Sequence, residues 1–333
     1  GGLLKETTTP MLAGVLPYRT AGRCRATASA LAALCLTLPA AEAARAEEPT
    51  REETLVIGKV TDNPRKHYWS LKPIAEYAVE RLEDAGLHHA RVLMAPDNAT
   101  MIRHLRNGRV DWVTETLFSA VLFEQEAGAH ILLHRWKKQA SEYQSVFFTR
   151  NDSSIHTLND LPGTLLALED SGSTSAFHLP LLLLLRAGLS PEVLPPDADR
   201  PADDSVGCVL VGQEINIAAW VHSGRADSGA YSNHDWNKPD HTPGSMRKNL
   251  RLFHRSKPVA RNLELVRPGF DGYRRKRLRA VLLEAGKTPG ARSVLRDYQE
   301  TARFETVTDE IRNDLQFARK TLSLVRAAVD ERR

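Results

Sequence analysis

Hydroxyl side chains gather in one short stretch, Ser173–Ser175, which lies between two apolar runs. The first run, 164–168, is typical of a buried strand, and the second, 179–185, of a helix. The first N–H groups of a helix have no partner within it, and the helix dipole makes that end positive. Three hydroxyls at such a point predict either an anion-binding site or an ordinary capped helix.

Several other chemistries are excluded by the same residues. The hydroxyl stretch contains no Lys or Arg and no Gly-x-x-x-x-Gly-Lys pattern, so it is not a nucleotide phosphate loop. It also lacks the Gly-x-Ser-x-Gly turn of a hydrolase, and no acid–base–nucleophile set accompanies it, so we predict no enzyme. The histidines and aspartates of 222–254 have spacings that match no standard metal site, and we predict no metal and no cofactor.

Composition indicates a soluble globular protein. The 333 residues are 42% hydrophobic and 26% charged, and they are enough for one large or two medium cores. The net charge is +4, but residues 1–46 contain five basic and two acidic side chains, which leaves a net charge of +1 for the rest. No strongly basic face for nucleic acid is therefore expected.

The first 46 residues have the pattern of a secretory signal peptide behind an upstream extension. Three arginines between 19 and 25 precede an apolar run at 26–40, and Ala-x-Ala cleavage sites follow at 41–43 and 44–46. The run is too short to span a bilayer as a stable helix. We predict an exported protein that retains only Cys208 after cleavage, an inert core residue without a disulfide partner.

The remaining chain alternates between strand and helix patterns, which predicts an α/β fold with largely parallel sheets. Expected strands are 54–60, 91–94, 110–113, 131–134, 145–150, 164–168, 206–211, 226–231 and 250–254; the last could return to the first unit. Expected helices are 71–85, 98–107, 118–126, 179–188, 214–222, 278–284, 290–299 and 308–329. The segments 61–70, 191–204 and 233–244 are expected to be loops or turns.

Ligands of such sheets bind at the carboxyl ends of the strands. The residues that follow the first and third expected strands are therefore candidates for the site: Tyr68, Trp69, Thr114, Glu115 and Thr116. Tyr68 and Trp69 are placed to cover a ligand, although Trp69 is equally consistent with a core position.

Six short motifs in a fixed order give a further indication. They are Ala95-Pro96-Asp97, 108–111 (GRVD), 143–146 (YQSV), 158–163 (LNDLPG), Ser173–Ser175 with Pro180, and 224–230 (GRADSGA). With these motifs, the chain resembles the PhnD-like substrate-binding proteins of phosphate, phosphite and phosphonate ABC transporters from about residue 55 to residue 329.

The resemblance implies a type II periplasmic-binding-protein fold with two lobes joined by two hinge strands. Lobe 1 would comprise 54–147 plus 258–333, and lobe 2 would comprise 148–257. The implied function is that of a monomeric, non-catalytic periplasmic receptor, which closes on a small phosphorus oxyanion and delivers it to a permease. The alternative is a sensing subunit that docks on a histidine-kinase ectodomain.

The resemblance also implies site residues. Ser173, Thr174 and Ser175 would hold the oxyanion, Tyr143 and Ser145 match a Tyr-x-Ser at the crossover between lobes, and Asp227 matches an acidic ligand-binding position. The chain departs from the family at three places: Ala176 replaces a Gly, Thr114–Thr116 replaces a covering aromatic residue, and Gln213-Glu214 occupies the region of a His.

These departures bear on the ligand. If Glu115, Glu214 and Asp227 all face the cleft, a dianion would be repelled unless one carboxyl were protonated. A ligand with a cationic end, such as an aminoalkylphosphonate, or a weakly acidic neutral ligand would then fit better than orthophosphate. Alternatively, Glu115 and Glu214 cap helices or pair with Arg side chains outside the cleft.

Overall fold

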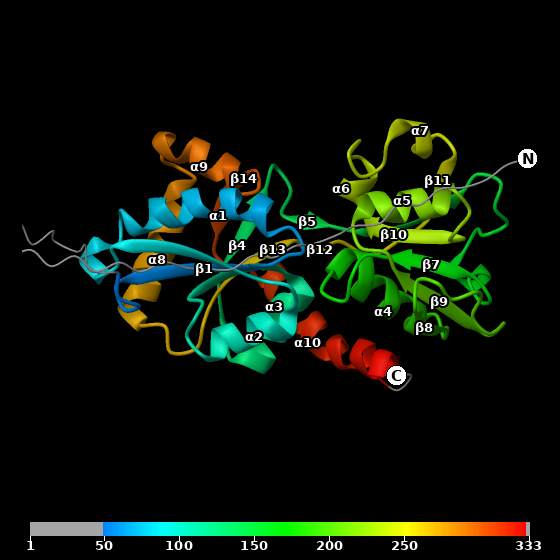
Figure 1. Cartoon of the computed structure of the whole chain (residues 1–333), viewed down its shortest axis with the longest axis horizontal. Helices are drawn as coiled ribbons and strands as arrows, with labels where there is room; N and C mark the ends of the chain where they lie inside the picture. The colour runs from blue at the N-terminus through cyan, green and yellow to red at the C-terminus, as the bar shows by residue number, and fades with distance from the viewer. Residues whose placement is uncertain (1–48, 331–333) are drawn as a thin grey trace, which may run out of the picture. The chain divides into compact units, whose positions relative to one another are not determined.

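The computed structural model describes residues 49–330, and the predicted signal peptide, 1–46, lies outside the described residues. Two six-stranded sheets and one short two-stranded ladder form the framework (Figure 1). No helix between residues 49 and 330 combines the length and the apolar character needed to cross a membrane.

The first sheet has the strand order β14-β4-β13-β3-β1-β2. Its strands are β1 (Thr54–Val60), β2 (His89–Ala95), β3 (Trp112–Thr116), β4 (His130–Lys137), β13 (Asn262–Val266) and β14 (Thr301–Glu305). Strand β1 pairs in parallel with β2 and β3, whereas β13 and β14 run antiparallel to their neighbours. We call this sheet and its helices lobe 1.

Lobe 1 buries both faces of its sheet, as parallel sheets usually do. Alternate residues of β1 divide between the faces: Leu55 and Ile57 pack with α1 (Pro64–Val79), α8 (Gly272–Ala285) and α9 (Arg292–Asp297). Val56 packs on the other side with α2 (Asn98–Arg106), α3 (Leu117–Ala127) and α10 (Asp309–Asp330).

The second sheet has the order β11-β6-β10-β7-β9-β8 and lies in the segment 145–255. Its strands are β6 (Ser145–Arg150), β7 (Leu165–Leu168), β8 (Ser190–Leu194), β9 (Ser205–Leu210), β10 (Ser228–Ser232) and β11 (Leu250–Arg255). Strands β8, β9, β7 and β10 are parallel, and only β6 opposes its neighbours. We call this sheet and its helices lobe 2.

The helices of lobe 2 also cover both faces of the sheet. Helix α4 (Leu179–Arg186) packs on one face, and α5 (Glu214–His222) packs on the other. The approach of α5 is close, because a Cβ on Gly229 of β10 would lie 2.7 Å from the Ile217 side chain. Short helices α6 (Asn233–Trp236) and α7 (Gly244–Arg247) follow β10.

Two crossings of the chain join the lobes. Strand β5 (Glu142–Tyr143) leads from β4 to β6, and β12 (Val259–Ala260) returns from β11 to β13; the two pair antiparallel. The expected fold class is therefore confirmed: two mostly parallel sheets flanked by helices and joined by two strands. The exact lobe boundaries at 147/148 and 257/258 stay a prediction.

Some expected elements differ from those observed. Helix α1 begins at Pro64 instead of near 71, because the Asn63 side chain caps it by accepting the Lys66 N–H. Strand β8 occupies part of the segment expected to be a loop, since an edge strand tolerates Pro191. Strand β11 pairs with β6 in lobe 2 and does not return to lobe 1.

Candidate functional site

Groups from both lobes meet at the beginning of α3. Strand β3 ends at Thr116, which is the N-cap residue of α3 but gives it no side-chain cap. The Phe118 N–H instead donates to Thr174 Oγ1 of lobe 2 at 3.0 Å, and the Thr174 hydroxyl donates to Thr116 Oγ1 at 3.1 Å. Thr174 is fully buried. A hydroxyl oxygen of one lobe thus caps the positive end of a helix of the other lobe.

The expected hydroxyl stretch does lie at the start of a helix. It opens a π-helical turn, η3 (Thr174–His178), which continues into α4, and the Ser173 hydroxyl caps the turn by accepting the Ala176 N–H at 3.1 Å. Ser145 lies beside it, because its hydroxyl donates to the Ser175 carbonyl at 2.7 Å. The structure therefore brings Ser145 together with Ser173, Thr174 and Ser175.

Tyr143 belongs to the same region. Its side chain is buried on β5 and faces Thr174 and Thr116, and burial raises the pKa of its hydroxyl. Among residues 49–330, no atom forms a hydrogen bond with this hydroxyl. The Arg261 guanidinium lies 5.7 Å from the centre of the Tyr143 ring, which adds a cation beside the hydroxyl corner formed by Thr116, Tyr143, Ser145 and 173–175.

Glu115 is engaged within lobe 1. One carboxylate oxygen accepts the Val60 N–H at 3.1 Å and lies 3.8 Å from Lys59 Nζ. The side chain is buried, so these contacts compensate its charge. The partners of Glu115 are thus a lysine and a backbone amide of β1, neither an arginine nor a helix start, and its place in the cleft stays a prediction.

Asp227 lies at the amino ends of β7 and β10, whereas the hydroxyl stretch follows the carboxyl end of β7. It precedes β10, and its carboxylate accepts the N–H of Leu165, the first residue of β7, at 2.9 Å. Arg200 pairs with the same carboxylate at 2.6 Å. The structure therefore does not bring Asp227 to Ser173–Ser175, which follow the carboxyl end of β7. The expected set of three carboxylates is not formed, and it no longer argues for a ligand with a cationic end.

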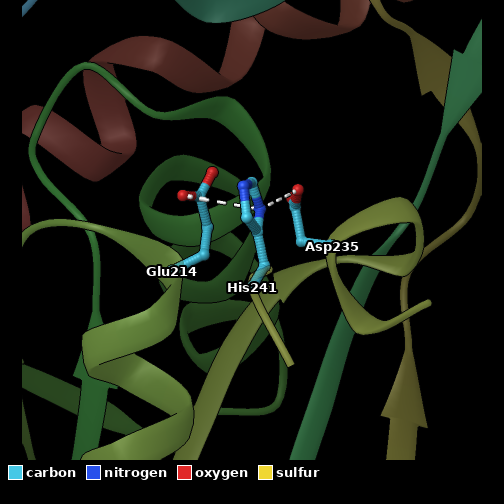
Figure 2. Close-up of side chains that lie close together, drawn as sticks. All are labelled: Glu214, Asp235 and His241. Carbon is cyan, nitrogen blue, oxygen red and sulfur yellow. Dashed lines mark hydrogen bonds and ion pairs between the residues drawn. The ribbon is translucent and has the colours of Figure 1, made fainter. Parts of the chain in front are cut away.

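Glu214 lies beyond the carboxyl ends of the strands of the second sheet, in a cluster of side chains that the sequence did not predict. It is the first residue of α5, and its Oε2 lies 3.7 Å from His241 Nδ1. Asp235 of α6 approaches the same nitrogen at 2.8 Å, so that His241 stands between two carboxylates (Figure 2). Burial and the neighbouring Asp235 raise the pKa of Glu214.

Glu169 adds another carboxyl group at the carboxyl ends of these strands. It follows β7 directly, and burial together with the charge of Glu214 raises its pKa well above the ordinary value. Residues 169, 214 and 235 share one signal that the sequence contained: each follows the carboxyl end of a parallel strand. The expected ends of these three strands lie within one residue of the observed ends, but the candidates chosen by this rule followed only the first and third expected strands.

Tyr68 and Trp69 lie in the first turns of α1, after the carboxyl end of β1. Their rings pack edge to face with centroids 5.3 Å apart, and Trp69 is 65% exposed. Trp69 is therefore not a core residue. No hydrogen bond or aromatic contact among residues 49–330 joins either ring to the hydroxyl corner.

One other buried polar group is structural. Glu264 of β13 and Arg135 of β4 form a fully buried ion pair at 2.9 Å, and Trp112, Tyr298 and Thr114 also donate hydrogen bonds to the carboxylate. All of these residues lie inside lobe 1, so they tie its central strands together.

The two-lobed fold and the paired helix starts define a class of solute-binding receptors, and comparison with known proteins agrees. The family model described as "ABC transporter, phosphonate, periplasmic substrate-binding protein" matches residues 61–311. The chain belongs to this family, which implies a periplasmic location, a small ligand, a permease partner and no catalytic role. A search of curated protein sequences found no match.

Solved structures share the fold. XAC2383 from Xanthomonas citri is 41% identical in its chloride-bound form, with a TM-score of 0.81 over 83% of this chain and 100% of that chain. Its ATP-bound form is 40% identical, with a TM-score of 0.79 over 83% and 99%. PhnD1 from Prochlorococcus marinus, in complex with methylphosphonate, is 17% identical with a TM-score of 0.63 over 82% and 99%.

Proposed function

We propose that this protein captures a small phosphorus oxyanion, such as a phosphonate, phosphite or phosphate, between its lobes and delivers it to a permease as a monomer. The observation that carries the proposal is the contact of the Thr174 hydroxyl with the Phe118 N–H and the Thr116 hydroxyl. The Thr174 oxygen lies where an oxyanion oxygen would accept the Phe118 N–H, and the Thr116 hydroxyl, which now accepts from Thr174, would turn to donate to the anion.

Binding would require the lobes to separate at this corner. The Thr174 hydroxyl oxygen now accepts the hydrogen bond of the Phe118 N–H at the start of α3, so a ligand must come between these two groups. Once it is there, the ligand would be held by the Phe118 amide, the hydroxyls of Thr116 and Thr174, and the first amides of η3. Contacts to both lobes would favour the closed form, as a population shift requires.

Two further features support an anion. The Tyr143 hydroxyl is buried without a partner, and a ligand oxygen would accept its hydrogen bond. The Arg261 guanidinium beside the ring contributes positive charge. The structures of the 41% identical Xanthomonas protein are described as bound to chloride and to ATP, both of which are anionic.

Thermal unfolding against a panel of solutes tests the proposal. The phosphorus oxyanions of the panel are phosphate, phosphite, methylphosphonate, 2-aminoethylphosphonate and ATP. Chloride, glucose and arginine are the solutes that lack a phosphorus oxyanion. A ligand at 100 times its dissociation constant adds about 2.7 kcal/mol to the free energy of unfolding and raises Tm by several degrees. Stabilisation by a phosphorus oxyanion is expected; stabilisation only by the solutes without one would contradict the proposal.

A further inference from the structure

Three potential metal ligands converge from three separate segments of lobe 2. Glu214 begins α5 after β9, Asp235 lies in α6 after β10, and His241 lies in the loop that leads to α7. One ligand atom of each lies within 4.8 Å of the other two (Figure 2). Each side chain is only partly buried, so an ion has access from solvent.

The distances indicate what kind of cation would fit. Ligands of a tetrahedral ion with bonds of about 2.0–2.1 Å lie about 3.3 Å apart. Acceptors around an ammonium group, at about 2.9 Å from its nitrogen, lie about 4.7 Å apart. His241 Nδ1 forms a hydrogen bond with Asp235 Oδ1 at 2.8 Å and lies 3.7 Å from Glu214 Oε2. A metal ion would replace the proton of that hydrogen bond and widen the shorter spacing to about 3.3 Å.

Neighbouring side chains hold the cluster in place. The Ser232 hydroxyl donates a hydrogen bond to the Asp235 carboxylate, and the Asp235 N–H donates to the Ser232 hydroxyl oxygen at 3.1 Å. On the far side of the imidazole, Lys238 Nζ lies 3.0 Å from His241 Nε2. Lys238 is exposed, so its flexible side chain can turn into solvent when Nδ1 binds a cation and Nε2 carries the proton.

We propose that Glu214, Asp235 and His241 bind a divalent transition-metal ion of the Zn²⁺ or Mn²⁺ class. Two carboxylates and one imidazole suit these ions better than Mg²⁺ or Ca²⁺, which prefer oxygen ligands alone. Three protein ligands leave a coordination position open to water or to a ligand oxygen. The site goes beyond the proposed anion receptor, and it stands or fails independently of it.

Metal binding to the full chain, stripped with EDTA and dialysed, tests the site without any phosphorus ligand. Calorimetry with Zn²⁺, Mn²⁺ and Mg²⁺ is run on the wild type, Glu214→Gln, His241→Gln and the control Asp240→Asn, an exposed neighbour outside the cluster. Co²⁺ then serves as a spectroscopic probe, because its visible absorption reports direct coordination. Circular dichroism checks that each variant is folded.

The expected result is one equivalent of Zn²⁺ bound by the wild type and by Asp240→Asn, with affinity lowered at least tenfold in Glu214→Gln and in His241→Gln. The Co²⁺ spectrum should change in the same two variants. The proposal is overturned if no stoichiometric metal binds, or if both variants bind as the wild type does. It is also overturned if the cluster binds no metal but Glu214→Gln weakens 2-aminoethylphosphonate binding in EDTA, since the cluster would then hold an ammonium group.

Discussion

The hydroxyl of Tyr143 is the most informative single group in the hydroxyl corner. It is buried and has no hydrogen-bond partner among residues 49–330. A buried polar group without a partner costs roughly 1–3 kcal/mol, so native proteins seldom keep one without a reason. A bound oxyanion supplies the reason, because it would accept the hydrogen bond that the protein does not.

We therefore expect Tyr143→Phe to leave the unliganded protein as stable as the wild type, or more stable by up to about 1 kcal/mol. The same variant should weaken binding of the best anion about tenfold. Urea unfolding and calorimetry measure the two quantities on the same samples.

Tyr231→Phe is the matched control. Tyr231 is also buried, but its hydroxyl is paired with Thr242 Oγ1 at 2.7 Å. Its removal should cost about 1 kcal/mol of stability and leave affinity unchanged. If Tyr143→Phe behaves like this control, the Tyr143 hydroxyl has no role in binding.

At this scale, the structure brings the expected hydroxyls together but not the expected carboxylates. Ser173–Ser175 could be found because consecutive hydroxyls before a helix are a local pattern. The convergence of Asp235 and His241 on Glu214 could not be predicted, since it depends on the arrangement of two strands and a loop. The family resemblance assigns Asp227 to the site, but its carboxylate binds Arg200 and the Leu165 N–H at the amino ends of β7 and β10.

At the scale of elements, η3 packs directly against α3. The His178 ring stacks on the Phe118 ring, with centroids 4.8 Å apart and planes 4° from parallel. Burial lowers the pKa of His178 to about 4, so the ring is neutral in the folded protein at neutral pH. The unfolded chain binds a proton near pH 6.5, and the stability that the neutral ring contributes is therefore lost as pH falls from about 6.5 towards 4.

His178→Phe should remove this acid sensitivity while keeping the stacked ring. Between pH 7 and pH 4.5, the wild type should lose about 2–3 kcal/mol more of its unfolding free energy than the variant. Urea unfolding at the two pH values measures the difference. Equal losses in both proteins would show that the pKa of His178 is the same in the folded and unfolded states.

The buried ion pair between Glu264 of β13 and Arg135 of β4 leads to a second prediction at the scale of elements. Glu264→Gln leaves the Arg135 charge buried without its partner, and should cost about 3–5 kcal/mol of stability. The double variant Glu264→Gln with Arg135→Met removes both charges and should cost less than the single change. Chemical unfolding of Glu264→Gln, Arg135→Met and the double variant measures this; a double variant as unstable as the sum of the two singles would show that the charges do not interact.

The same pair explains why β13 was missed in the sequence. The segment 262–266 carries a Glu at its centre, which local patterns do not assign to the middle of a sheet. Only the distant Arg135 makes that position tolerable. By contrast, β6 and α5 were predicted with their observed bounds, because their apolar patterns and the Gly224 stop are local.

At the scale of the molecule, one apolar cluster extends through both lobes. It includes Val121 of α3, Leu182 of α4 and Leu315 of α10. Phe317 of α10 contacts both sides: its ring packs edge to face against Phe118, and the Arg186 guanidinium lies 5.0 Å from its centre. The C-terminal helix therefore favours contact between the lobes even without a ligand.

Phe317→Ala should shift the unliganded protein towards an open form. Small-angle scattering should show a larger radius of gyration than for the wild type, and saturating ligand should restore the smaller value. Leu324→Ala on the same helix is the control, since Leu324 is 54% exposed. Identical scattering from all three proteins would contradict a role for α10 in holding the lobes together.

The central claim is that an oxyanion binds where Thr174 now meets the start of α3. Calorimetric titration of the best anion into the wild type, Thr174→Val and Thr174→Ser tests it most directly. Hydrogen bonds to charged groups contribute roughly 1.5–3 kcal/mol, so Thr174→Val should bind at least tenfold more weakly, whereas Thr174→Ser keeps the hydroxyl and the affinity. Wild-type affinity in Thr174→Val would contradict the account and place the ligand elsewhere.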